Sequence, residues 1–264
     1  MFHHLKRDLS VFNRRYFESL YFLTKTAIMR QYRESFLGMF WSVIQPGIQV
    51  VVLSLVFTLI VRFDTENYTL LLMSGFLPWT FMHNSFSLGS NSLILKSILI
   101  KNGCILPKTM FIISDTFVGI YVMLVSFVAM YLVVGTFFTG LSFYFFLLPV
   151  VLLPVIIFTI CVCVILAYVA PYMKDISHLI GIVMGSLFWS VPIVYPASVI
   201  PDKYLIFFEI NPFYILIKPI QELVHGSTFP SIDHLVYAFG VAFISFILSW
   251  IVQKKLRRNV VYYL

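Results

Sequence analysis

Between Thr116 and Met173 the chain reads TFVGIYVMLVSFVAMYLVVGTFFTGLSFYFFLLPVVLLPVIIFTICVCVILAYVAPYM, and this run holds no Asp, Glu, Lys or Arg. One helical pass through a bilayer takes about 20 apolar residues, so the run is long enough for two passes. Thr139-Gly140 and Ser142 suit an uncharged turn between the two passes. The stretch therefore predicts the greater part of two consecutive transmembrane helices, at about 111–135 and 143–169.

The composition of the whole chain is that of a membrane protein. Its 264 residues are 60% hydrophobic and 11% charged, whereas soluble domains carry about 25% charged residues. A water-soluble fold of this length cannot hide so much apolar surface. The net charge of +7 does not indicate nucleic-acid binding, because the basic residues flank the apolar runs, where membrane orientation and anionic lipids account for them.

Apolar runs divide the chain into six predicted spans. A basic connector with Lys96, Lys101 and Lys108, closed by Pro107, separates the second span from the third. Six spans place fifteen of the 18 Lys and Arg residues on one side of the membrane, which predicts that both termini are cytoplasmic. The predicted spans are 36–61, 70–95, 111–135, 143–169, 176–199 and 235–252, and 253–264 is the cytoplasmic tail.

An amphipathic helix is predicted ahead of the first span, over 13–33. At about 100° per residue, most of its large apolar residues fall on one half of the helix and its charges on the other. Such a helix lies flat in the membrane interface with its cations among the lipid headgroups. A cytoplasmic helix packed on a partner is the alternative. The predicted interface cations are Arg14, Arg15, Lys25, Arg30 and Arg33.

Residues 200–233 mix charges and prolines with apolar residues, which predicts short helices rather than a full span. Asn211-Pro212 fits an N-cap followed by proline at the first helical position, and Gly226 fits a C-terminal stop. The enclosed helix is about 20 Å long, too short to cross the bilayer. We predict a re-entrant or gate hairpin at the outer face over 205–225, with gate residues Asn211, Pro212, Phe213 and Pro219.

The sequence shows no catalytic or metal-binding motif that we recognise. It lacks a nucleotide-binding loop, an H-E-x-x-H pair, a nucleophile elbow and Cys-rich metal spacing, and Cys161 and Cys163 fit small core residues. We therefore expect no metal and no cofactor on this chain, no catalytic residue and no enzymatic activity. Asp115 is predicted to be structural, either as a cap or paired with Lys108 or Lys101. The alternative is a membrane enzyme that uses His83, Asp115 or His178.

Aromatic residues make up 18% of the chain, and membrane packing and interface belts account for most of them. A second interpretation is that some of them line a conduit, because sugar rings pack their C–H faces on aromatic faces without a fixed register. A polymer can slide over such a wall, whereas charged pockets hold one unit in place. The residues with this predicted role are Trp41, Trp79, Phe81, Trp189 and Tyr195.

Several segments resemble, in the right order, the type-2 ABC (ABC-2) exporter permeases that move polysaccharides. The resemblance covers nearly the whole chain, and the family includes permeases for O-antigen, capsule and wall teichoic acid. One departure is the sequence LPK at 106–108, where members often have an aromatic residue before the proline and arginine after it. The matching segments are SFLGMFWSVIQP (35–46), GFLPWTF (75–81), IK and LPK (100–101 and 106–108), YMKDISH (172–178), PIVYP (192–196) and NPF (211–213).

The resemblance implies an all-α integral membrane protein with the ABC-2 exporter fold, 1–264 being one transmembrane domain. It implies a homodimer with two cytoplasmic ATPase subunits, which hold ATP and Mg²⁺, in the inner membrane. The implied substrate is a lipid-linked, polyprenyl-type glycan, most simply O-antigen, that enters laterally; capsule, teichoic acid and small hydrophobic molecules are alternatives. The implied ATPase-coupling residues are Lys96, Lys101, Pro107, Lys108, Lys174 and Asp175.

Overall fold

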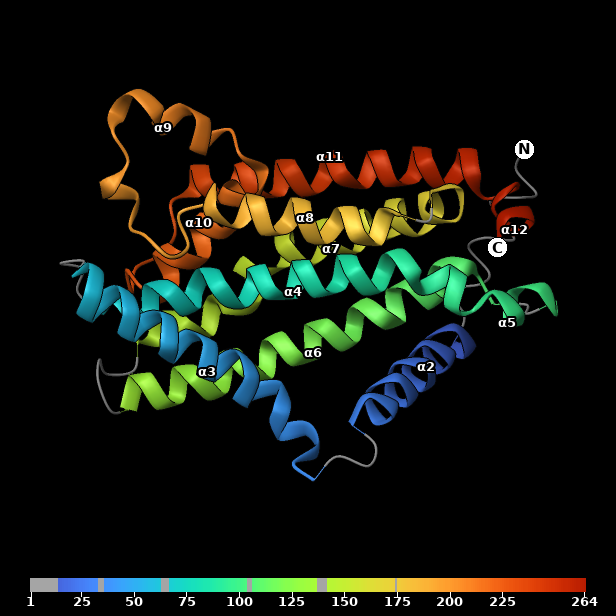
Figure 1. Ribbon diagram of the computed structural model, residues 1–264, viewed down its shortest axis with the longest axis horizontal. Helices are drawn as coiled ribbons and strands as arrows, with labels where there is room; N and C mark the ends of the chain where they lie inside the picture. The colour runs from blue at the N-terminus through green and yellow to red at the C-terminus, as the bar shows by residue number, and fades with distance from the viewer. Residues whose placement is uncertain (1–13, 33–35, 63–66, 104–105, 137–141, 174) are drawn as a thin grey trace.

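The computed structural model describes residues 14–32, 36–62, 67–103, 106–136, 142–173 and 175–264, and these ranges contain helices and no strand (Figure 1). Four helical stretches in them are long and apolar enough to cross a membrane. They coincide with the first, third, fourth and sixth predicted spans, so the all-α membrane architecture is confirmed. These stretches are Gly38–Val61, Lys108–Val134, Phe143–Tyr172 and Ile232–Leu256.

The predicted second span is the central helix of the bundle, α4 (Tyr68–Leu95), and it is more polar than the four candidate spans. It packs against α6 (Lys108–Val134) and α7 (Leu148–Val169), and most of its residues are buried. Two of the buried serines on α4 bond to their own helix: Ser74 Oγ donates to the carbonyl oxygen of Leu71 at 2.6 Å, and Ser90 Oγ donates to that of Ser87 at 2.9 Å. Such back-bonding satisfies hydroxyl groups without water, which explains how this helix tolerates its polarity.

Small residues allow α4 to approach its neighbours closely. A Cβ placed on Gly89 would lie 2.8 Å from both the Cβ and the Sγ of Cys163 on α7. A Cβ on Gly119 of α6 would lie 2.8 Å from Ser85 Oγ on α4. Close contact through small residues is the usual way in which membrane helices associate. Cys161 and Cys163 are buried free thiols, as the sequence predicted.

The fifth predicted span, 176–199, is helical only in its first part. Helix α8 (Ile176–Trp189) ends at Trp189, and two prolines, at 192 and 196, follow in a segment that is not helical. Proline disfavours helix for itself and for the residue before it, which explains the early end. With 14 residues, α8 is about 21 Å long, so the predicted continuous helix to Val199 is wrong.

Residues 191–194, in the segment after α8, are buried, and side chains satisfy part of their backbone. Tyr68 Oη donates to the carbonyl oxygen of Val194 at 2.5 Å, and Gln221 Nε2 donates to that of Pro192 at 2.8 Å. Irregular backbone is tolerated at membrane depth only where protein or water satisfies it in this way. The short α8 and the buried segment together take the place of the predicted fifth helix.

Two helices occupy the predicted hairpin region, α9 (Asp202–Glu209) and α10 (Pro212–Val224). The predicted N-cap is confirmed, since Asn211 Oδ1 accepts a hydrogen bond from the backbone N–H of Phe213 at 3.0 Å. α10 packs against α4, α7 and α11 (Ile232–Leu256), and α9 extends away from the bundle (Figure 1). The apolar residues that α10 buries most completely are Leu216, Ile217, Ile220 and Leu223.

The N-terminal helices cover one side of the bundle. α2 (Arg14–Tyr32) packs against α6, so part of the face that was predicted to lie on the membrane contacts the protein. The first span consists of a 3-10 turn η1 (Gly38–Phe40), α3 (Trp41–Leu55) and a π-helical turn η2 (Val56–Val61). Only 6% of the most apolar 18-residue stretch of this span is buried, so most of its surface is open to lipid or to another chain.

The two ends of the bundle carry different elements (Figure 1). We call the end with α5 (Ser97–Lys101), η5 (Ala170–Tyr172) and α12 (Val260–Tyr263) the connector end. α5 lies in the first connector, between α4 and α6, and η5 lies in the second connector, between α7 and α8. The opposite end, with α9, the buried segment after α8 and the turn between α10 and α11, is the gate end.

Candidate functional site

A cleft of about 620 Å³ runs along one face of α4. Its walls come from α3, α4, α6 and α8, with Gln31 of α2 at the edge. Tyr195 lies outside the cleft and lines a separate apolar pocket of about 480 Å³ beside α9. The structure thus brings together four of the five predicted wall aromatics, namely Trp41, Trp79, Phe81 and Trp189.

These four aromatic residues contribute to the cleft in different ways. Trp79 and Phe81 are each only 4% exposed, so they form its floor. Trp41 on α3 and Trp189 on α8 are 44% and 59% exposed and present large ring surfaces at its two sides. Apolar ring faces at opposite sides of a groove can stack against a flat, partly apolar ligand.

Uncharged polar side chains form another part of the lining, which the sequence analysis missed. Gln45 and Gln49 of α3 are exposed, and they lie one helical turn apart on one face. His83 and Asn84 of α4 and Ser126 of α6 also line the cleft. No Asp, Glu, Lys or Arg occurs among the described lining residues. The signal that could have found this lining was the pair of glutamines in an otherwise apolar span.

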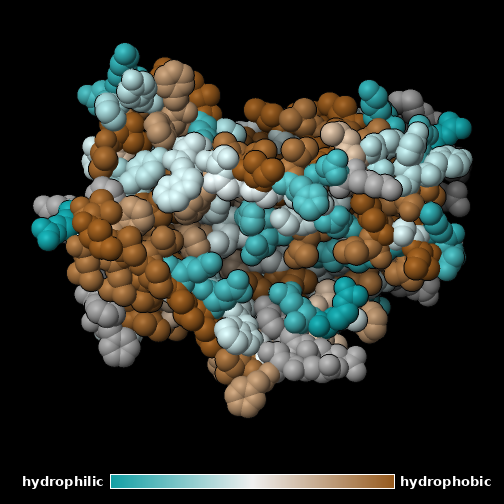
Figure 2. Space-filling model, in the orientation of Figure 1, coloured by the Kyte–Doolittle hydropathy of each residue, from teal (hydrophilic) through white to brown (hydrophobic). Residues whose placement is uncertain are grey.

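The polar lining interrupts the hydrophobic surface of this face. Figure 2 shows hydrophilic residues across the middle of the molecule, with a broad hydrophobic surface beside them where α3 lies in Figure 1. Amide groups left in hydrocarbon without partners are unfavourable. The cleft is therefore suited to contain water, a polar ligand or the surface of another chain.

One predicted gate residue, Phe213, contacts the aromatic residues of the cleft directly. The ring of Phe213, at the start of α10, lies 5.4 Å from that of Trp79 and 5.7 Å from that of Phe158. Pro212 is the first residue of α10 after the Asn211 cap, and Pro219 is buried within the helix. A movement of the N-terminal end of α10 would therefore shift the floor of the cleft.

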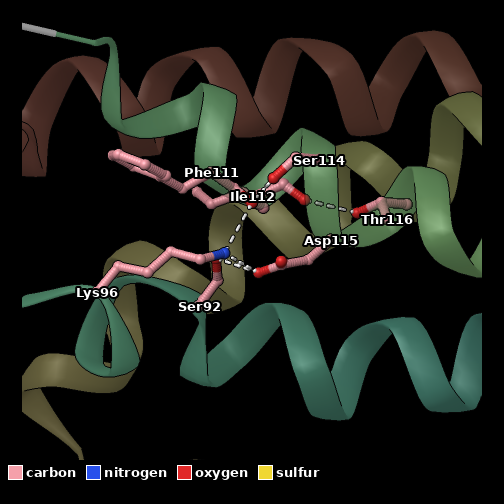
Figure 3. A network of polar contacts seen from close by, with 7 residues as sticks. All are labelled: Ser92, Lys96, Phe111, Ile112, Ser114, Asp115 and Thr116. Carbon is pink, nitrogen blue, oxygen red and sulfur yellow. Dashed lines mark hydrogen bonds and ion pairs between the residues drawn. The ribbon is translucent and has the colours of Figure 1, made fainter. Parts of the chain in front are cut away.

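Lys96 is held in a polar network between α4 and α6 (Figure 3). Its Nζ lies 2.5 Å from Asp115 Oδ2 and 3.3 Å from the carbonyl oxygen of Phe111, and Ser92 Oγ donates to the same carboxylate oxygen at 2.6 Å. The two charged side chains are about one-fifth exposed. The predicted partner of Asp115 was wrong: it pairs with Lys96 rather than with Lys108 or Lys101, because α4 and α6 pack side by side.

The other predicted coupling residues lie at the connector end. Lys101 is exposed at the end of α5, and Asp175 is exposed just before α8. Pro107 precedes α6 in an extended conformation, and Lys108 Nζ donates to the carbonyl oxygen of Arg257 at 3.0 Å. Lys174 lies outside the described residues.

The predicted interface cations are described in part. Lys25 and Arg30 are exposed on α2, and Lys25 Nζ lies 5.9 Å from the ring centroid of Tyr21. Arg14 begins α2, but its side chain and that of Arg15 are outside the described part, as is Arg33 entirely. The exposed cations of α2 are therefore on the side of the helix that α6 leaves uncovered.

The three residues of the enzyme alternative are not brought into one cluster. His83 lines the cleft, Asp115 is paired with Lys96, and His178 is exposed on α8. No hydrogen bond joins any two of these side chains, and among the described residues no group of three His, Cys, Asp or Glu side chains is placed to hold a metal ion. The geometry thus offers an open groove whose described lining includes His83 but no Asp, Glu, Lys or Arg.

Comparison with known proteins identifies a family and several relatives of this chain. Residues 18–224 match the family described as ABC-2 type transporter. A relative named O-antigen export system permease protein RfbA, from Myxococcus xanthus, is 24% identical over 230 residues, covering 86% of this chain and 87% of the relative. Two Klebsiella pneumoniae relatives with the same name are 24% identical over 214 residues (80% and 82% covered) and 23% identical over 243 residues (91% and 93% covered).

Proposed function

This chain belongs to the ABC-2 type transporter family, and from that premise we propose that it is the membrane-spanning permease subunit of an ATP-driven exporter of O-antigen, a lipid-linked polysaccharide. The relatives that carry this name are similar over most of their length, which supports the choice of cargo. In this proposal the chain has no nucleotide site, and a partner ATPase supplies ATP hydrolysis.

The cleft is the observation that carries the proposal. A glycan presents C–H faces, which pack on the rings of Trp41 and Trp189, and hydroxyl groups, which bond to the amides of Gln45 and Gln49. The described lining has no Asp, Glu, Lys or Arg that would hold one sugar unit in place. Such a wall supports movement of a polymer past it, with Trp79 and Phe81 beneath.

A second copy of the chain would turn the cleft into a conduit. α3 is the least covered span, and its glutamines need a polar surrounding. We propose a homodimer in which α3 and α8 of the two copies enclose the cleft, with lateral entry for a polyprenyl-linked glycan. In the membrane each subunit has six membrane segments, with α4 and the α8 region as the second and fifth, and α9 and α10 form a re-entrant gate at the outer face.

The connector end supports the proposed orientation in the inner membrane. Both termini are cytoplasmic in this arrangement, because the basic residues concentrate there. Two ATPase subunits, with ATP and Mg²⁺, would meet α2 and the connectors through Lys101, Pro107, Lys108, Lys174 and Asp175. Lys96 would act indirectly, by holding the first connector in place through Asp115.

The test is the fate of lipid-linked glycan in a strain that lacks the gene. We expect long polymer to accumulate on the cytoplasmic side and surface O-antigen to disappear, with a plasmid copy of the gene restoring both. The sugars of the trapped pool would distinguish O-antigen from capsule or teichoic acid. Unchanged surface glycan without accumulation would contradict glycan export and favour export of a small hydrophobic molecule.

A further inference from the structure

The C-terminal segment, residues 257–264, ties the two connectors together. α12 contacts both α5 of the first connector and η5 of the second. Val260 is fully buried, and the ring centroid of Tyr263 lies 4.4 Å from that of Tyr172. Before α12, the carbonyl of Arg257 accepts the hydrogen bond from Lys108 at the start of α6. These contacts make the connectors and the end of α11 one structural unit.

The outward side of this unit carries basic and aromatic side chains, together with the exposed carboxylate of Asp175 in the second connector. Tyr262 is 87% exposed, and Arg258 and Lys101 are exposed as well. α12 and α5 lie at the same end of the bundle (Figure 1). Neither 253–264 nor 96–108 contains an Asp or Glu. Tyrosine and arginine are among the residues most enriched at the energetic centres of protein interfaces. A basic surface of this kind suits a partner with an acidic surface.

We propose that the C-terminal segment, residues 257–264, completes the docking surface for the ATPase, with Arg258 and Tyr262 making direct contacts. The inference rests on the proposed function, which supplies the partner, and adds the C-terminal segment to the connectors as a binding element. Because α12 contacts α5 and η5 together, a partner seated on it engages both connectors at once. One movement of the ATPase then reaches α4 and α6 through the first connector, and α7 and α8 through the second.

The test measures binding between the full-length permease in detergent and the separately purified ATPase subunit of the same transporter. The variant is Arg258→Glu with Tyr262→Ala. The control is Lys203→Glu with Tyr204→Ala, a matched basic–tyrosine pair exposed on α9 at the gate end. We expect the first variant to bind the ATPase about tenfold more weakly or worse, and the control to bind like the wild type. Binding of the wild type should weaken as salt rises.

The outcomes separate this inference from the proposed function. If the wild type binds the ATPase and the Arg258/Tyr262 variant binds equally well, the docking role of the C-terminal segment is wrong and the permease assignment stands. If the wild type itself binds no ATPase, the proposed function is wrong, and the inference that rests on it is wrong as well. Normal ATPase binding with reduced binding to phosphatidylglycerol vesicles would show that lipid headgroups occupy the segment, which also overturns the inference.

Discussion

The two sides of α4 use small and polar residues for opposite purposes. On the packed side, Gly89 lies against Cys163 of α7 and Gly75 lies close to Ile193, so that backbone and side chains meet without space between them. On the open side, His83 and Asn84 line the cleft, where their polar groups remain available. A polar side chain in a membrane helix is tolerated where it bonds to the backbone of its own helix. It indicates a binding site where its polar groups remain free for a ligand.

The spans that flank α4 show the same contrast. In the span of α7, 56% of the most apolar 18-residue stretch is buried, whereas in the span of α3 only 6% is, although both spans are apolar enough to cross a membrane. Hydropathy therefore does not tell which helix holds the bundle together and which one faces a second chain or a conduit. Substitutions on the packed side should act on stability, and substitutions on the open side should act on export.

The largest effect is expected from Asp115→Ala at the packed α4–α6 contact. It leaves Lys96 as a largely buried charge without its carboxylate partner and should destabilise the protein by about 3 kcal/mol. Thermal unfolding of the detergent-purified protein measures the change, with Asp175→Ala as an exposed control. The double variant Lys96→Met with Asp115→Leu should recover most of the loss, and no recovery would mean that the network has another role.

A somewhat smaller loss of stability is expected from Gly89→Val. The first added carbon already lies 2.8 Å from Cys163, so α4 and α7 must separate, at a cost of about 1–3 kcal/mol. The control is Gly240→Val on α11, where a Cβ meets nothing within 4 Å. The yield of monodisperse protein after detergent extraction should fall for the first variant alone. Equal yields would show that the close α4–α7 contact is unimportant for folding.

On the open side, Gln45→Leu with Gln49→Leu should leave stability within about 0.5 kcal/mol of the wild type. Export should fall about thirtyfold, because the two hydrogen bonds to the glycan in the proposed function are lost at about 1 kcal/mol each. Ile48→Leu with Val52→Leu, on the same helix but outside the cleft lining, is the control. The measurement is the amount of surface O-antigen at equal membrane levels of permease. Unchanged export would show that the two glutamines do not contribute to the conduit.

The smallest effect is expected from Trp189→Leu, which should lower export several-fold because one stacking surface is lost at about 1 kcal/mol. Trp250→Leu on α11 is a close match, since Trp189 and Trp250 are 59% and 56% exposed, and only Trp189 lines the cleft. The same surface O-antigen assay compares them. Equal reductions in both variants would indicate a general effect of exposed tryptophans in the membrane rather than a conduit wall.

Patterns local in the chain predicted most of the helices. The run from Thr116 to Met173 predicted α6 and α7, and Asn211-Pro212 predicted the start of α10, because apolar length and capping chemistry act over a few residues. The end of α8 at Trp189 was not predicted from the sequence, although Pro192 follows it. A helix can end there because Tyr68 and Gln221 donate hydrogen bonds to the non-helical backbone that follows. Both residues are distant in sequence from the segment that they support.

By itself, the sequence determined an all-α membrane protein with basic connectors and a resemblance to ABC-2 permeases, because these properties depend on composition, order and short motifs. Only the tertiary structure decided that Asp115 pairs with Lys96, that Gln45 and Gln49 lie in the cleft with four of the predicted aromatics, and that α12 joins the connectors. The physical reason is that hydropathy fixes which segments leave water, whereas helix packing fixes which faces of those segments meet.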